Sequence, residues 1–371
     1  MKARFDAAGV ALTALLCIAV ALAALVFVPS SPALLVDDPV ILLEMDTGFV
    51  NEWEEPVLLT VTGYSATIAA GVVLAMLVTA ALGCAHGLKL TQGAATAALC
   101  GVGALIGGHG LYCLLRWGYI INDLGGTWTF LLQPWQGGFT MFGAILGGLL
   151  GGVAAAKLAG RGVACTMDMI IPGLLILLVA GRMGEMLTGQ GMANYRAAEA
   201  LRMLPFASTN EWGDPELAVY AYEALAGIAA LITAAVLLWQ RKPAGRAAEC
   251  ALAIVSAYQL VLDSMRGDEL IRFGFVCLNM IAAAAVLVFI IATRIIRRVR
   301  RDGWKPWDTW RIVLLLGGAG VVIATEFALD GKIKLPGVTS TMLYVIDLLA
   351  VTGMMLSVAI GDGREEVAGC K

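Results

Sequence analysis

Apolar segments long enough to cross a bilayer follow one another along almost the whole chain. They are separated by short polar stretches and cover residues 7–28, 56–84, 92–115, 138–156, 165–187, 218–239, 248–265, 273–293, 312–329 and 341–360. Each segment is predicted to be an α-helix, because lipid-exposed backbone must satisfy its own hydrogen bonds. The pattern therefore predicts an all-α fold, a polytopic transmembrane bundle of about ten helices.

The composition agrees with a membrane protein and argues against a metal or cofactor site. Of the 371 residues, 60% are hydrophobic and 14% are charged, whereas a soluble domain carries about 25% charged residues. The chain has two histidines and eight cysteines, and no two cysteines form a C-x-x-C pair. We therefore interpret the cysteines as small buried hydrophobic residues and predict neither a metal ligand set nor a cofactor.

The distribution of basic residues predicts the orientation of the helices. Lys2 and Arg4 precede the first apolar run, which is long for a signal peptide, and they favour a cytoplasmic N-terminus. Alternating helices then put 17 basic residues in cytoplasmic segments, among them the dense run 294–311, and 6 in outer loops. An even number of spans also returns the C-terminus to the cytoplasm. The basic run is typical of contact with anionic lipid headgroups, and no nucleic-acid partner is expected.

Polar residues inside the predicted helices gather near the outer face of the membrane. This set consists of Tyr64, His109, Arg182, Glu185, Tyr222, Glu223, Gln259, Asp263 and Arg266. Charged groups in a bilayer are costly and usually mark a functional site. The alternative is that these groups only neutralise one another inside the bundle.

Residue spacing brings these side chains onto shared helix faces. Arg182 and Glu185 are three positions apart, and Gln259, Asp263 and Arg266 follow at intervals of four and three. Two guanidinium groups with carboxylates nearby suit a phosphate, because the planar fork of arginine matches phosphate geometry. The spacing thus predicts a binding site for a phosphate headgroup in the outer leaflet.

The glycine-rich run 137–152 has a different predicted role. Gly143, Gly147 and Gly151 lie four positions apart, which is typical of two helices in close contact. The run lacks the GK[ST] ending of a phosphate-binding loop, so we expect helix packing rather than nucleotide binding.

Several motifs resemble one family when they are taken in order along the chain. Residues 181–190 (GRMGEMLTGQ) resemble GRxGNFxNxE, residues 135–143 (WQGGFTMFG) resemble W-D/Q-GGMSFHG, and residues 222–225 (YEAL) resemble QLYEAL. The spacing of Gln259, Asp263 and Arg266 resembles RxxxExxR, and Asp38 and Tyr64 resemble the DPVIF…WYG entry. Over residues 37–293 the chain therefore resembles the bacterial prolipoprotein diacylglyceryl transferases.

The resemblance implies a fold, a reaction and partners. It implies a seven-helix core within residues 33–296, an additional N-terminal anchor in 1–32, and a basic linker with two additional helices in 297–371. The implied reaction transfers the diacylglyceryl group of phosphatidylglycerol to the lipobox cysteine of a prolipoprotein signal peptide in the bacterial cell membrane, and glycerol phosphate leaves. The site would face the outer leaflet and membrane lipid.

The resemblance also implies roles for individual residues. Arg182, Glu185, His109 and Tyr64 are the expected catalytic residues. The expected substrate-binding residues are Arg266, Asp263, Tyr222, Glu223, Gly137, Gly138, Gly184, Gln190 and Gln259. The chain departs from the family pattern where Phe142 replaces a histidine, Glu185 and Thr188 replace asparagines, Gln190 replaces a glutamate and Gln259 replaces an arginine. His109 and Glu185 are the candidates for the proton acceptor that Phe142 cannot be.

Two other functions compete with an active transferase. The replacements at Phe142 and Gln259 favour a catalytically degenerate paralogue that binds phospholipid or preprotein, or one that acts on another acceptor. A transporter is disfavoured, because the sequence shows no inverted repeat and no pair of Gly/Pro-broken helices at the midplane.

Overall fold

The fold is that of a polytopic helix bundle, and the computed structural model describes residues 7–27, 40–50, 56–122, 127–134, 138–197, 202–203, 206–209, 213–267, 272–273, 276–333 and 336–359. The helices are α1 (Ala7–Phe27), α2 (Gly63–Ala85), α3 (Leu90–Leu115), α4 (Trp117–Asn122), α5 (Met141–Leu158), α6 (Val163–Gly184), α7 (Val219–Trp239), α8 (Arg246–Met265), α9 (Leu278–Asp302), α10 (Pro306–Leu329) and α11 (Ser340–Ala359). Nine helices in this part of the chain are long and apolar enough to span a membrane, and α1 adds a shorter apolar stretch, Gly9–Leu25. The predicted all-α transmembrane bundle is confirmed.

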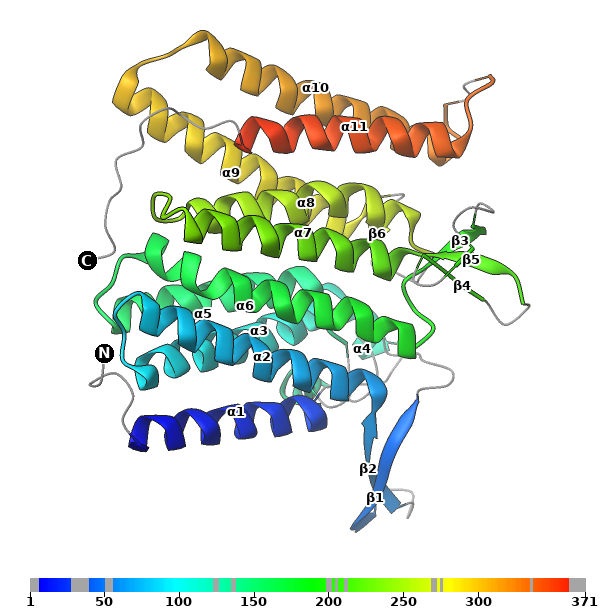
Figure 1. Cartoon of the computed structure of the whole chain (residues 1–371). Coiled ribbons are helices and arrows are strands. Elements are labelled where there is room, and N and C mark those ends of the chain that lie inside the picture. Colours follow the sequence, from blue (N-terminus) through cyan, green and yellow to red (C-terminus); the bar gives the residue numbers. More distant parts are fainter. Residues whose placement is uncertain are drawn as a thin grey trace.

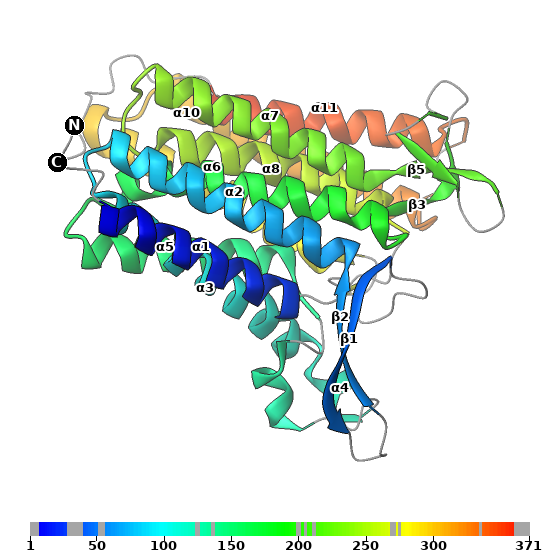
Figure 2. The same ribbon diagram turned by 60° about the horizontal axis from the view of Figure 1, so that its bottom comes forward.

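Short strands gather at one end of the bundle. They are β1 (Ile41–Val50), β2 (Pro56–Thr62), β3 (Met192–Arg196), β4 (Ala207–Thr209), β5 (Pro215–Ala218), β6 (Arg272–Phe273) and β7 (Val276–Cys277). They form two antiparallel pairs, β1–β2 and β6–β7, and a three-stranded sheet in the order β3-β5-β4. The start of α1 and the end of α11 lie at the opposite end of the bundle (Figure 1). Figure 2 shows the β1–β2 hairpin and α4 projecting from the bundle.

Several predicted helix boundaries are wrong, and two of them differ by seven residues or more. Residues 56–62 form strand β2 rather than the start of a helix, and the helix begins only after Thr62, which caps α2 through a reciprocal pair of hydrogen bonds with Ser65. At the other end, α9 continues nine residues past position 293, to Asp302. Two arginines in this last part of α9 form ion pairs, Arg294 with Glu249 on α8 and Arg298 with Asp308 on α10. The charged stretch that the sequence predicted to be a linker therefore remains helical.

The close contact predicted for the glycine-rich run is confirmed between α3 and α5. A Cβ atom at Gly147 would lie 2.0 Å from the carbonyl oxygen of Gly103, and one at Gly151 would lie 2.3 Å from that of Leu99. Backbones can approach this closely only where at least one of the two helices has glycine at the contact. This contact places the start of α5 beside the end of α3, which is the end of the bundle that carries the strands.

The helices that follow the core pack against its α8–α9 face. Leu287 and Ile291 of α9, Val322 of α10 and Met354 of α11 share one buried cluster with Leu260 of α8. Six of the eight cysteines, at positions 17, 84, 100, 113, 250 and 277, are buried free thiols, as interpreted from the sequence. The interpretation is wrong for Cys165, which is disulfide-bonded. The N-terminal end of α8 is held by Asp168 of α6, whose carboxylate accepts hydrogen bonds from the backbone N–H groups of Gly245 and Ala248.

Candidate active site

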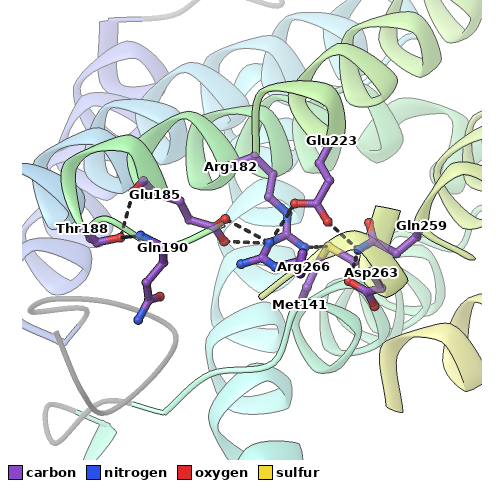
Figure 3. Close-up of polar contacts among 9 residues, drawn as sticks. All are labelled: Met141, Arg182, Glu185, Thr188, Gln190, Glu223, Gln259, Asp263 and Arg266. Atoms are coloured by element: carbon purple, nitrogen blue, oxygen red, sulfur yellow. Dashed lines mark hydrogen bonds and ion pairs between the residues drawn. The ribbon is translucent and has the colours of Figure 1, made fainter. Parts of the chain in front are cut away.

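Six polar side chains from three helices meet inside the bundle, at its strand-bearing end. This cluster, called the arginine–carboxylate cluster below, consists of Arg182, Glu185, Glu223, Gln259, Asp263 and Arg266 (Figure 3). Each member is at most 7% exposed, and Asp263 is fully buried. Arg182 lies in the last turn of α6, and Glu185 opens the 3₁₀ turn η4 (Glu185–Leu187). Glu223 lies in the second turn of α7, Gln259 and Asp263 lie in the last two turns of α8, and Arg266 is the residue that ends α8. The structure thus brings together residues separated by up to 84 positions in the sequence, which the sequence predicted to gather near one face of the membrane.

Glu185 bridges the two arginines. Its Oε1 accepts from Nη1 of Arg182 at 2.6 Å, and its Oε2 accepts from Nη1 of Arg266 at 3.0 Å. Glu223 forms a second bridge, since its Oε2 lies 3.1 Å from Nε of Arg182 and 2.8 Å from Nη1 of Arg266. Two carboxylates therefore hold the two guanidinium groups next to each other, which is the arrangement a single phosphate would require of its cations.

Gln259 connects the remaining carboxylate to this pair. Its side-chain amide donates to Oε1 of Glu223 at 2.6 Å and to Oδ1 of Asp263 at 2.5 Å. Oδ2 of Asp263 has no hydrogen-bond partner among the described residues. A buried ionic network is stable only when its members are paired, so removing one arginine would leave uncompensated charge.

Tyr64 and Gly184 form the wall of the cluster on the α2 side. A Cβ atom at Gly184 would lie 3.0 Å from the Tyr64 ring and 3.5 Å from Cβ of Thr67. The Tyr64 side chain, 7% exposed, interacts electrostatically with the charges of Arg182, Glu185 and Arg266. Glycine at position 184 thus lets an aromatic ring lie between α2 and the end of α6.

His109 lies apart from the arginine–carboxylate cluster, in contact with the segment before α5. Its Nδ1 is 3.1 Å from the carbonyl oxygen of Gly138, and its Nε2 is 3.1 Å from that of Phe130. The ring is 3% exposed and stacks on Phe130. Both nitrogens face acceptors, so the imidazole fixes the segment between η2 (Trp128–Leu132) and α5, and its role as proton acceptor stays a prediction.

Three other predicted site residues, Tyr222, Gln190 and Gly138, lie outside the arginine–carboxylate cluster. The Tyr222 ring lies 5.6 Å from that of Phe206, against the small sheet. The backbone N–H of Gln190 donates to the hydroxyl of Thr188, and Figure 3 shows the Gln190 side chain directed away from the two guanidinium groups. Gly138 needs its positive φ of 79° and leaves no room for a side chain beside Tyr112. Gly137 lies outside the described residues.

Phe142 shows what replaces the family histidine. Its side chain is 7% exposed and belongs to the apolar cluster formed with α8, α9, α10 and α11. The preceding residue, Met141, contacts the site instead, since its sulfur accepts from Nη2 of Arg182 at 3.0 Å. A thioether is only a weak acceptor and cannot take the proton that an imidazole would.

Gly191 is a site residue that the sequence did not reveal. It has a φ of 75°, and a Cβ atom there would lie 2.6 Å from Oε2 of Glu185 and 2.8 Å from Cβ of Tyr220. Its carbonyl oxygen accepts from the backbone N–H of Tyr220. The available signal was the pair Gly189 and Gly191 directly after the 181–188 motif, which is typical of a chain that turns sharply over a site.

Replacing Gly191 by alanine should disturb the cluster, and Gly189 provides the matched control. Both glycines have positive φ, so alanine at either position costs about 1–3 kcal/mol of backbone strain. Only at Gly191 would the methyl group also displace Glu185, because no atom lies within 4 Å of a Cβ at Gly189. Thermal unfolding of the detergent-purified variants should show a larger loss for Gly191→Ala. Equal losses would contradict the contact with Glu185.

Comparison with known proteins gives the family. Residues 56–297 match the family of prolipoprotein diacylglyceryl transferases, which is more than half of the chain. The chain belongs to this family. It is 26% identical over 199 residues to phosphatidylglycerol–prolipoprotein diacylglyceryl transferase of Listeria innocua, covering 52% of this chain and 69% of that protein. It is 26% identical over 259 residues to the enzyme of the same name of Limosilactobacillus reuteri, covering 67% and 90%.

Membership of the diacylglyceryl transferase family fits the helices described above. The family is one of transferases, and the relatives that match are bacterial. Together with the nine candidate spans, this makes the chain a multi-pass membrane protein of the bacterial kind. The match begins at the first residue of β2 and ends within α9, so it includes every member of the arginine–carboxylate cluster.

Proposed function

We propose that the chain transfers the diacylglyceryl group of phosphatidylglycerol to the lipobox cysteine of a prolipoprotein. The observation that carries this proposal is the pair Arg182 and Arg266, held side by side by Glu185 and Glu223 inside the membrane-spanning bundle. The names of the relatives support the donor and the acceptor. Family membership supports the reaction type.

The two arginines suit the bond changes that this reaction needs. The cysteine sulfur would attack the glyceryl carbon that carries the phosphate ester, an S–C bond would form, and the C–O bond would break. The electron pair stays on the phosphate oxygen, and glycerol phosphate leaves while the thiol proton passes to a base. Guanidinium groups stabilise the charge that develops on the phosphate, which lowers the barrier. Tyr64, whose ring packs against Gly184 and which interacts electrostatically with Arg182, would donate a hydrogen bond to the same headgroup.

We also propose that the site faces the outer leaflet and that both termini are cytoplasmic. In support, the cluster lies at the strand-bearing end of the bundle, while α1 begins and α11 ends at the other end (Figure 1). The paired arginines of α9 and their partners Glu249 and Asp308 belong to that second end. Basic residues are retained on the cytoplasmic side of membrane proteins. Substrate lipid and a secreted signal peptide would then reach the site from the outer leaflet.

A second candidate function is lipid or preprotein binding without transfer. Phe142 supports it, because an apolar side chain that cannot accept a proton stands where the family pattern has a histidine. The pairing of both arginines with Glu185 and Glu223 supports it as well, because their charges are already compensated. The two candidates differ in a single measurable product, the lipidated cysteine.

Complementation separates the two. The chain is expressed in a bacterium depleted of its own diacylglyceryl transferase, and a reporter lipoprotein is followed by gel shift and intact mass. Transfer predicts a reporter heavier by one diacylglyceryl group, and this product should be lost with Arg182→Ala at equal amounts of membrane-inserted protein. An unmodified reporter, with the chain confirmed in the membrane, would favour binding without transfer.

A further inference from the structure

The arginine–carboxylate cluster has more carboxyl groups than cations. The two guanidinium groups of Arg182 and Arg266 face Glu185, Glu223 and Asp263, and Gln259 contributes a neutral amide rather than a charge. All members are at least nine-tenths buried, so water cannot screen a surplus charge. A surplus anion in such a place is costly unless it carries a proton.

The hydrogen bonds identify which carboxyl group has room for a proton. Both oxygens of Glu185 lie on arginine nitrogens, and both oxygens of Glu223 are occupied by Gln259 and the arginines. Asp263 differs, because only its Oδ1 is bonded, to Gln259. Its Oδ2 is fully enclosed and has no hydrogen-bond partner in the part of the chain that the structure describes. A buried polar atom without a partner commonly marks the position of a missing ion, water or ligand group.

An anionic headgroup at the arginines makes the imbalance larger. A phosphodiester adds one negative charge, so two cations would face four anions if every carboxyl group were ionised. We propose that Asp263 is protonated whenever an anionic phospholipid headgroup occupies the cluster, and that its Oδ2–H then acts as a hydrogen-bond donor inside the site. This inference rests on the proposed function for the identity of the ligand, phosphatidylglycerol, and it makes Asp263 a positioning residue for that headgroup.

The charged and titratable groups around Asp263 come from every element packed against it. They are Arg182 at the end of α6, Glu223 of α7, Arg266 at the end of α8 and the thiol of Cys277, whose sulfur lies 3.9 Å from the backbone oxygen of Asp263. Glu185 is bonded to the same two arginines, and Tyr64 of α2 interacts with them. The arginines are compensated by Glu185 and Glu223, and the phenol and thiol are neutral groups. Asp263 is therefore the group whose ionisation opposes binding of the anionic headgroup.

The proposal gives a sign for the effect of pH. Because the complex holds a proton that is lost when Asp263 ionises, affinity for the anionic lipid must fall as the pH rises. At pH values where Asp263 is ionised in the free protein but protonated in the complex, binding takes up one proton. The affinity then falls about tenfold for each pH unit. The phosphodiester stays singly charged throughout, so it adds no pH dependence of its own.

The test is a binding titration of the full-length chain in detergent with a short-chain phosphatidylglycerol, by calorimetry, from about pH 6 to about pH 9, where strongly buried acids titrate. The wild type should lose at least about tenfold in affinity over this range. Asp263→Asn, which keeps the shape and a donor but cannot ionise, should bind with a flat profile and more tightly than the wild type at high pH. Asp347→Asn is the matched control, because Asp347 is an equally buried carboxyl on α11 that has no contact with the cluster among the described residues.

Three results would overturn the proposal. They are a flat wild-type profile, weaker binding by Asp263→Asn at every pH, which would make Asp263 an anion that orients Arg266, and no phosphatidylglycerol binding at any pH. A short-chain diacylglycerol, which lacks the phosphodiester, should show no such profile. The outcome is separable from the transfer reaction, since pH-linked binding without a lipidated product would defeat the proposed function alone, and transfer with flat binding would defeat this proposal alone.

Discussion

Replacing Arg266 by alanine should cost more stability than any other single change in the arginine–carboxylate cluster. Its Nη1 lies between Glu185 and Glu223, at 3.0 Å and 2.8 Å, and the side chain is 4% exposed. Without it, two buried carboxylates share one remaining arginine, and breaking a buried pair in this way costs about 3–5 kcal/mol. We expect a correspondingly lower midpoint of unfolding for the purified protein in detergent.

A second variant separates stability from function at the same residue. The double variant R266A/E223Q removes one cation and one anion together, so most of the lost stability should return. Transfer activity should not return, because the phosphate would still lack one of its two cations. A double variant that stays as unstable as Arg266→Ala would contradict the ion-pair account of the cluster. One that recovers transfer would contradict the role of Arg266 in binding the headgroup.

Replacing Gly147 by alanine should cause the second large loss of stability, at a position outside the arginine–carboxylate cluster. The added methyl group would meet backbone atoms of Gly103, at 2.0 Å from its oxygen and 2.8 Å from its carbon, and Cα of Gly107 at 2.9 Å. Backbone cannot move aside as a flexible side chain can, so α3 and α5 must separate along their contact. Overpacking of this kind costs about 1–3 kcal/mol and sometimes more, and we expect the upper end.

Gly110→Ala is the matched control for this helix pair. Gly110 lies on α3, and no atom lies within 4 Å of a Cβ built there. Alanine favours helix by up to about 1 kcal/mol over glycine, so this variant should be unchanged or slightly stabilised. Unfolding midpoints of the two purified variants, measured side by side, give the comparison. Equal midpoints would contradict the close approach of α3 and α5.

The parts of the fold that the sequence predicted are those set by lipid. Hydrophobic length determined the spans, and the i,i+3 and i,i+4 spacings of Arg182, Glu185, Gln259, Asp263 and Arg266 put them on facing helix surfaces, where the structure joins them. Glycines at four-residue intervals predicted the α3–α5 contact. Hydrophobic length, helical spacing and glycine spacing are local, periodic features, so a single sequence is enough to recognise them.

The parts that could not be predicted depend on contacts between distant residues. Strand β2 has the apolar composition of a helix, and only its pairing with β1 makes it a strand. His109 was predicted at the same level in the membrane as the site, but its nitrogens contact carbonyl oxygens 21 and 29 residues away in the sequence. The position of a residue along a predicted helix does not show such contacts. Gly191 matters because the chain returns over Glu185, and Met141 because α5 begins beside α6.

If the paired arginines serve diacylglyceryl transfer, the reaction should proceed with purified components. The chain is incubated with phosphatidylglycerol and a synthetic peptide that contains a lipobox cysteine, and the peptide mass is measured. We expect a peptide heavier by one diacylglyceryl group, one glycerol phosphate released for each peptide modified, and no product when the cysteine is replaced by serine. An unmodified peptide in the presence of protein that binds phosphatidylglycerol would contradict this expectation.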